Sequence, residues 1–260
     1  MINYLTKTAM FIPLLTAINS AEMTSKAGGY LGLQAGLSRQ FYDVRTSFLG
    51  DSRNENFTNP NALTPHNKSR KNNAFIGGLI AGYGWVFQDT IYTALEANIS
   101  KEGNKTFTAR DSNMQDELGG IVHNESKVLY KRGLAFGLSA RLGYIIKAWV
   151  PFVKFGFSIS RDNIKQELNI DNQNPHPDPY LTTNRYSANK TITSFIIGAG
   201  ADYYFTNNWL GRLTYEYRTQ PNIKLPTIQE TANAGSKTYA GSRFKNIRSH
   251  TLQLGVVYKF

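Results

Sequence analysis

Apolar and polar residues alternate along most of the chain. In Tyr30–Ser38, for example, Leu31, Leu33 and Leu37 share one parity, while the other parity carries small or polar residues. A period of two places successive side chains on opposite faces of a β-strand. Eight segments show this alternation and are predicted strands: Tyr30–Ser38, Phe75–Phe87, Ile91–Ser100, Gly133–Tyr144, Trp149–Ser160, Ser194–Phe205, Trp209–Arg218 and Ser249–Phe260.

The two faces of these segments differ in composition. The less apolar face is built mainly from Gly, Ala and Ser, which suit a crowded interior better than contact with water. The other face is continuously apolar, and aromatic residues lie near the segment ends: Tyr83, Trp85, Tyr144, Trp149, Tyr203, Trp209 and Tyr258. An outward apolar band with aromatic girdles is typical of a transmembrane β-barrel. Segments of about 9–13 residues are long enough to cross a membrane at a tilt of ~45°.

The links between the segments alternate in length. Three are short, namely Gln88–Thr90, Ile145–Ala148 and Thr206–Asn208. The other four are much longer: Asp43–Asn72, Lys101–Lys127, Arg161–Thr191 and Thr219–Arg248. Short periplasmic turns and long outer loops are expected of bacterial barrels. The pattern therefore predicts an all-β fold, an eight-stranded antiparallel transmembrane β-barrel with four long extracellular loops and short periplasmic turns.

Composition agrees with this class. The chain has 260 residues, a net charge of +11 and no Cys, and its mean hydropathy is −0.38. That mean is too polar for a bundle of membrane-spanning helices, each of which needs about 20 apolar residues in a row. The lack of Cys excludes disulfide scaffolds, thiol catalysis and Cys-ligated zinc.

The N-terminal residues are predicted to be a secretory signal peptide. Met1–Lys7 is short and polar with one positive charge, Ala9–Ala17 is apolar, and Asn19–Ala21 ends in small residues. This is the three-part layout of a signal peptide, although with a single Lys in its first region. We expect residues 1–21 to be the signal peptide and residues 22–260 to be the barrel.

The last strand carries a more specific signal. Leu254, Val256 and Tyr258 alternate and lead to Phe260, the last residue. A terminal Phe with an aromatic residue two positions earlier resembles the signature by which outer-membrane barrels are recognised for insertion. The chain from about Gly28 to Phe260 resembles the OmpA/OmpX and opacity-type family of eight-stranded outer-membrane β-barrels.

The resemblance implies a surface protein of the Gram-negative outer membrane, with roles in adhesion, antigenicity or membrane integrity. The barrel-assembly machinery, outer-membrane lipid and lipopolysaccharide are the partners that it implies. Since the sequence stops at Phe260, we expect no separate peptidoglycan-binding domain. We expect a monomer.

Charged residues of the interior parity form a candidate network. Eight strands enclose a space that side chains just fill, so we expect these acids and bases to pair in a packed lumen. The alternative is a gated small-solute pore, with Glu96 and Arg141 as a switchable pair. The network comprises Glu96, Arg141, Lys154, Asp202, Arg212 and Glu216, with Arg218 and Lys259 as further candidates.

Candidate catalytic residues are few. Some eight-stranded barrels modify lipid A with a Ser/His site, and Ser249 beside His250 is the only such pair here. Adjacent residues of a strand point to opposite faces, so they do not form a nucleophile–base pair unaided. His66, His123 and His176 lie far apart in sequence and have no metal-site spacing. We therefore predict no enzyme, metal or cofactor.

Positive charge concentrates in the last long link. Its cations are Lys224, Lys237, Arg243, Lys245 and Arg248, against one acid, Glu230. One interpretation is attraction to the surrounding lipopolysaccharide, because a field of one sign attracts anions without specificity. The other is a docking surface for acidic host glycans or proteins. No nucleic-acid-binding fold accompanies the charge, so nucleic acid is not an expected partner.

Overall fold

The structure is a computed structural model. It describes residues 26–51, 66–103, 105–115, 121–172, 181–224, 228–231 and 237–260. The predicted signal peptide lies outside these ranges. Within them the regular elements are β-strands, and no helix is long and apolar enough to cross a membrane.

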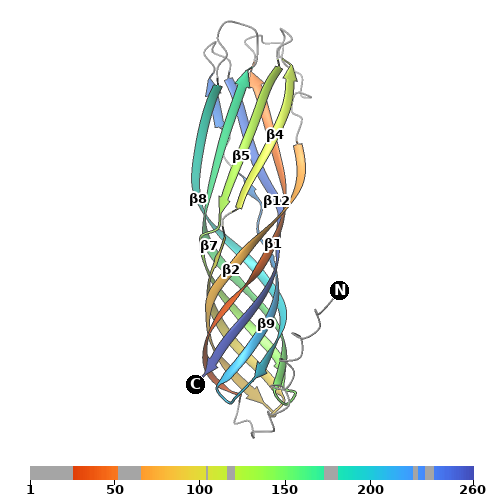
Figure 1. Cartoon of the computed structure of the whole chain (residues 1–260), viewed down its shortest axis with the longest axis vertical. Helices are drawn as coiled ribbons and strands as arrows, with labels where there is room; N and C mark the ends of the chain where they lie inside the picture. The colour runs from red at the N-terminus through yellow and green to blue at the C-terminus, as the bar shows by residue number, and fades with distance from the viewer. Residues whose placement is uncertain are drawn as a thin grey trace, which may run out of the picture.

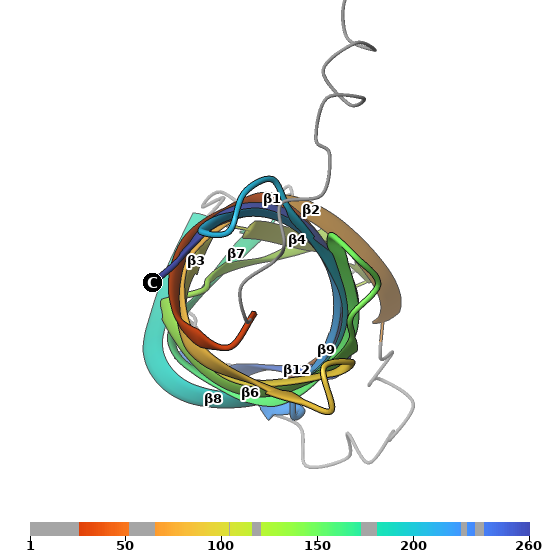
Figure 2. The ribbon, with the colours of Figure 1, turned by 90° about the horizontal axis from the view of Figure 1, so that it is seen from below.

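Eight strands form a closed antiparallel ring, as predicted. Each strand pairs with the next, and the last pairs with the first. Figures 1 and 2 show the resulting tube from the side and along its axis. In ring order the strands are β1 (Gly28–Asp51), β2 (His66–Phe87), β3 (Ile91–Glu102), β6 (Leu134–Tyr144), β7 (Trp149–Asn172), β8 (Leu181–Tyr204), β9 (Trp209–Thr219) and β12 (Lys237–Lys259).

The strands are strongly staggered. Following paired residues once round the ring from Tyr30 leads back to β1 at Gln40, ten residues further on. A stagger of this kind tilts the strands, and in an eight-stranded ring it leaves an interior that side chains fill. The path runs through Gly82, Glu96, Ser139, Gly156, Ile196, Arg218 and Ser249.

One end of the barrel, the turn end, carries the three short links at their predicted positions. The first is a tight turn in which Gln88 and Asp89 have φ angles of 50° and 55°, and the Thr90 amide donates to the Phe87 carbonyl at 3.3 Å. The C-terminus lies at the same end, where the Phe260 amide donates to the Gly29 carbonyl at 2.9 Å.

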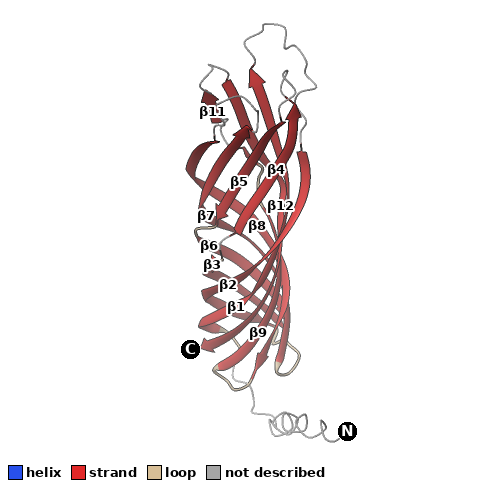
Figure 3. Ribbon diagram, turned by 45° about the horizontal axis from the view of Figure 1, so that its top comes forward, coloured by secondary structure: helices blue, strands red, loops and turns tan. Residues whose placement is uncertain are grey.

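At the opposite end, the loop end, the structure corrects the predicted bounds of the strands. Much of the four links predicted as loops is strand (Figure 3). β1, β2, β7, β8 and β12 have 22–24 residues, whereas β3, β6 and β9 have 11 or 12. The strand bounds were predicted from an outward apolar face, and that face ends before the strands do.

Additional strands complete the wall at the loop end. The hairpin of β4 (Lys105–Gln115) and β5 (Ile121–Lys131) continues the wall above β6, because β5 pairs with β7. Above β9, the short strands β10 (Ile223–Lys224) and β11 (Ile228–Thr231) pair with β12. We call this part of the barrel the loop-end wall.

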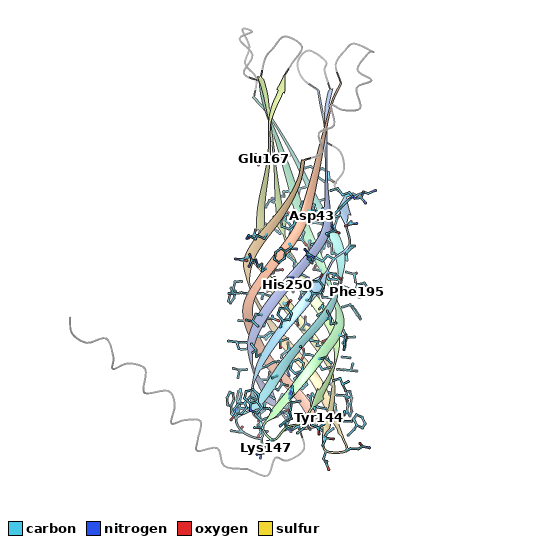
Figure 4. All side chains as sticks on the ribbon, turned by 90° about the vertical axis from the view of Figure 1, so that its right-hand side faces the viewer. Asp43, Tyr144, Lys147, Glu167, Phe195 and His250 are labelled. Carbon is cyan, nitrogen blue, oxygen red and sulfur yellow. The ribbon has the colours of Figure 1, made fainter. Side chains whose placement is uncertain are left out.

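The predicted faces of the eight segments are confirmed. Leu138 is 47 % exposed in the middle of β6, whereas its neighbour Ser139 is 2 % exposed. The outward Leu, Ile, Val and Phe side chains form a continuous apolar band, visible as the sticks around the barrel in Figure 4. Aromatic pairs at its turn-end border include Trp149 with Tyr203 and Trp209 with Tyr258.

The interior is layered along the barrel axis. The inward residues of β7 give the order from the turn end, with Val150, then Lys154, then Ser158 and Ser160, and finally Ile164. The turn-side apolar layer comprises Tyr30, Ile80, Tyr92, Ala94, Val150, Tyr204, Leu210 and Val257. The loop-side apolar layer comprises Tyr42, Tyr130, Ile164, Ile192, Ile223, Phe244 and Ile247. A charged layer and a layer of hydroxyl groups lie between them.

Candidate functional site

The charged layer is organised around Glu96 on β3. Its carboxylate accepts hydrogen bonds from the Tyr30 hydroxyl at 3.0 Å and the Lys154 amine at 2.9 Å. The Arg212 guanidinium also donates to it, and Arg141 Nη1 lies 3.6 Å away. The five side chains come from five strands of the ring, so this carboxylate ties together opposite parts of the wall.

Asp202 is the second acceptor of this layer. Arg141 Nη2 donates to it at 2.7 Å, and Arg212 donates through Nε at 2.7 Å and Nη2 at 3.1 Å. The Arg141 guanidinium stacks on the Phe152 ring, 3.7 Å from its centroid. A Cβ atom at Gly200 would lie 2.5 Å from that ring, so the glycine makes room for the stacked pair.

Lys154 extends the network toward the loop end. Its amine donates to Glu96 and Glu216 at 2.9 Å each, and Arg218 donates to Glu216 at 3.3 Å. The structure thus brings all six predicted lumen charges, and Arg218, into one buried network. Lys259 also faces inward, but it donates to the Ala27 carbonyl at 3.2 Å instead. Glu96 and Arg141 are one link of this network rather than an isolated pair.

A second buried cluster at the loop-end border escaped prediction. Arg132 Nη1 donates to Glu102 at 3.2 Å, the Tyr130 hydroxyl donates to Asp162, and the Gly133 amide donates to Asp162 at 3.1 Å. Burial and the Asp162 carboxylate raise the pKa of Tyr130 well above its usual range, which keeps the hydroxyl a donor.

Sequence parity could have revealed part of this cluster. Glu102 continues the inward parity of Glu96, and Asp162 continues that of Lys154. Both were assigned to loops because the strands were ended where the apolar face ended. Arg132 has no comparable signal, because it lies in the short link between β5 and β6.

The basic residues of the last long link lie on strands. Lys224 is exposed on β10, whereas Lys237, Arg243, Lys245 and Arg248 belong to β12. The β12 backbone bulges at Asn246, which has a φ angle of 53°. There its side-chain amide donates to Asp43 at 2.8 Å, and its backbone amide donates to Asn222 at 3.2 Å. The positive charges therefore sit on a strand scaffold.

A row of exposed cations marks the loop-end border of the apolar band. It consists of Arg39, Lys101, Arg161 and Arg248, on four different strands. For Arg39, Lys101 and Arg161, the next outward residue toward the turn end is apolar. These residues are Leu37, Ile99 and Ile159. Arg39 and Arg248 both stack on Phe41, at 5.5 and 5.8 Å from its centroid. We call this row the border belt.

The remaining predicted residues occupy separate places. Leu254, Val256 and Phe260 point outward on β12, and Tyr258 packs between Trp209 and Phe260. Ser249 is buried in the lumen, whereas His250 faces outward and hydrogen-bonds Tyr215. Among the described residues, no group of three or more acidic or His side chains is placed to hold a metal ion. His176 lies outside them.

Comparisons with known proteins agree with this architecture. The family model described as "Outer membrane protein beta-barrel domain" matches residues 9–260. The 31 kDa outer-membrane immunogenic protein of Brucella melitensis biotype 1 is 24% identical over 237 residues, covering 91% of this chain and 84% of that protein.

Two solved structures match most of the chain at low similarity. Neisserial surface protein A is 16% identical with a TM-score of 0.38, and the match covers 91% of this chain and all of that one. The outer membrane protein OprG of Pseudomonas aeruginosa is 15% identical with a TM-score of 0.39, covering 92% of this chain and 98% of that one. The closed ring, the apolar band and the family match together show that the chain belongs to the outer-membrane β-barrel family of Gram-negative bacteria.

Proposed function

We propose that the protein is a surface anchor that presents its loop-end wall to acidic glycans outside the cell. The observation that carries this proposal is the length of the strands. β1, β7 and β8 have 24 residues each, about twice the number needed to cross the apolar band. At about 3.3 Å per residue, the additional strand residues extend the loop-end wall well above the membrane.

The charge of the last segment supports an acidic partner. Lys224 is exposed, Lys245 is partly exposed, and β12 carries both Lys245 and Arg243 on the outward side of the loop-end wall. Arginine and lysine bind sulfate and carboxylate groups through charge-assisted hydrogen bonds. The name of the Brucella relative, an immunogenic outer-membrane protein, is compatible with exposure at the cell surface.

The interior supports a surface role more strongly than a pore. Two apolar layers close the lumen above and below the charged network. In the charged layer, Glu96, Lys154 and Arg212 are each 4 % exposed or less. An eight-stranded barrel has no spare width for a channel beside such side chains. Ser249 and His250 carry no reaction in this proposal, because the barrel wall separates their side chains.

The border belt has a separate role in the proposal. Its cations lie where the apolar band ends, so they are placed to contact the phosphates of lipopolysaccharide in the outer leaflet. An exposed Arg beside an anionic surface contributes about 1 kcal/mol. The belt then fixes the depth of the barrel, and the loop-end wall remains free for its partner.

Binding of the full-length protein in outer-membrane vesicles to immobilised heparin tests the proposal. We expect the double variant Lys224→Glu and Lys245→Glu to reduce binding at least tenfold at physiological salt. The matched control is the double variant Lys71→Glu and Lys165→Glu, because both lysines are exposed, on β2 and β7, and the same charge change is made elsewhere. Equal binding by wild type and the double variant would contradict the proposal, as would an equal loss in the control.

A further inference from the structure

The layer between the charged network and the loop-side apolar layer is lined by buried hydroxyl groups. Each is 3 % exposed or less and makes no hydrogen bond within the described part of the protein. The strand register sets Ser38 opposite Thr251 and Ser158 opposite Ser194. The hydroxyl layer comprises Ser38, Ser158, Ser160, Ser194, Ser249 and Thr251.

Two arginines border this layer with donors to spare. Arg132 is bonded to Glu102 and Arg218 to Glu216, at 3.2 and 3.3 Å. In Arg132 the Nε and Nη2 groups have no partner among the described residues, and in Arg218 the same holds for Nε and Nη1. Buried N–H groups without an acceptor are costly, by roughly 1–3 kcal/mol each. Both guanidiniums therefore need further acceptors.

The two guanidiniums also repel one another. Both are cations buried in the same part of the lumen, and like charges repel when they are removed from water. Glu216 is shared with Lys154, which lies 2.9 Å from it, so it neutralises Arg218 only in part. A water molecule would accept hydrogen bonds here, but it would not offset the repulsion. An anion would do both.

Most side chains of the hydroxyl layer are small. The charged layer is filled by Arg, Lys, Glu and aromatic side chains, whereas the hydroxyl layer has mainly Ser, Thr and Ala135, with Gln40, Ile76 and Ile196 as larger members. Because all layers fill a tube of the same width, smaller side chains occupy less of it. The apolar layer above and the charged layer below exclude a large ligand.

We propose that the hydroxyl layer binds a small inorganic anion, with chloride as the simplest case, between Arg132 and Arg218. The unused guanidinium N–H groups are donors only, so they suit an anion and not a cation, and the hydroxyls can donate to the same anion. Register places Ser249 directly beside Arg218, so its hydroxyl and the guanidinium can donate to the same ion. The site is separate from the cell-surface role proposed above and stands without it.

Crystals of the full-length barrel grown in sodium bromide give the direct test. The expected result is an anomalous peak inside the lumen, within hydrogen-bond distance of Arg218 and of at least one hydroxyl of the layer. Peaks confined to the protein surface, or water alone in the layer, would overturn the proposal. An unchanged peak in the Arg218→Gln variant would also overturn it.

A solution measurement gives independent evidence. A ligand that binds only the folded state raises the unfolding temperature as its concentration rises. At constant ionic strength, we expect replacing gluconate by chloride to raise the unfolding temperature of the detergent-folded barrel. Arg218→Gln should abolish this dependence. Arg185→Gln is the control, because Arg185 is an exposed arginine paired with Glu167 at 3.3 Å, and it should retain the dependence.

If Arg218→Gln does not yield a folded, heat-modifiable barrel, the double variant Ser194→Ala and Ser249→Ala replaces it. This pair removes two hydroxyls and retains both arginines. We expect the chloride concentration that gives half the effect to rise at least tenfold. The same half-effect concentration in wild type and double variant, or no chloride dependence in wild type, would refute the site.

Discussion

The barrel inside the apolar band and the loop-end wall above it have opposite polarity, although the same strands build both. Along β7, Phe155 faces outward and Lys154 inward within the band. Further along the same strand, Lys165 faces outward and Ile164 is fully buried inside. On β8 the outward residue changes from Phe195 to Thr191, beside the inward Ile192. The surroundings of each part, lipid or water, determine which residues its outer surface accepts.

The interior is also filled differently within the apolar band and in the loop-end wall. Within the band, lipid covers the outward apolar side chains, and the lumen holds the paired charges together with the turn-side apolar layer. Above the band, water covers the outside, and the strands bury their apolar side chains in the ordinary way. The two parts should therefore respond differently to the same kind of substitution.

The largest expected effect is the loss of the network centre. Glu96→Gln leaves Lys154, Arg141 and Arg212 with one acidic partner fewer in a buried site, which costs about 3–5 kcal/mol of unfolding free energy. Urea unfolding followed by gel mobility measures this change. The control is Glu167→Gln in the exposed pair with Arg185, which should cost less than about 1 kcal/mol. Similar losses in the two variants would show that water solvates the charges of the lumen network.

The next effect concerns the loop-end wall. Ile164→Ala removes a side chain that is 0 % exposed, and large-to-small changes in a core cost about 2–5 kcal/mol. Ile159→Ala, on the outward face of the same strand and 43 % exposed, should change stability by about 0.5 kcal/mol. The same unfolding assay compares the two. A larger loss for Ile159→Ala would mean that the polarity does not invert.

A third prediction concerns the band itself. Leu138→Lys places a charge on the outward face in the middle of β6, at a cost of about 2–4 kcal/mol. Leu134→Lys makes the same change at the loop-end border of the same strand, where the cost falls to about 0–1 kcal/mol. Unfolding in lipid bilayers measures both. Equal costs at the two depths would be incompatible with Leu138 facing the lipid interior.

The smallest effect should follow a charge change outside the band. Lys165 is exposed on the outer side of the loop-end wall, so Lys165→Glu should alter the unfolding free energy by less than about 0.5 kcal/mol. Comparison with Leu138→Lys then places the membrane border between the two positions. A loss above about 2 kcal/mol at Lys165 would move that border outward.

Sequence parity was sufficient to predict the ring and its lumen charges. Glu96, Lys154 and Asp202 each interrupt a small-residue face, and a period of two places them inside. The loop-end wall was missed because its apolar residues, such as Ile164 and Ile192, have the inward parity. A prediction that defines a strand by one apolar face therefore ends it where polarity inverts, although the backbone pairing continues.

The partners within the network were less accessible to sequence reasoning. Arg141 bonds mainly to Asp202 because of how far the strands are shifted along one another. The alternation of apolar and polar residues carries no information about that shift. Phe152 and Gly200 form part of the site through packing alone, one as a stacking surface and the other as the space beside it. Such contacts join residues of different strands and have no local signal.

The seam between β1 and β12 has a consequence for biosynthesis. Tyr30 pairs with Lys259 and Asp51 with Lys237, so the ring is closed by residues from opposite ends of the chain. A growing chain that lacks β12 leaves β1 and β9 with open hydrogen-bonding edges, which invite pairing with other chains. Contacts so distant in sequence also make folding slow. The polypeptide must therefore be kept unfolded in transit until its last strand is available, and a truncated product has no stable barrel to form.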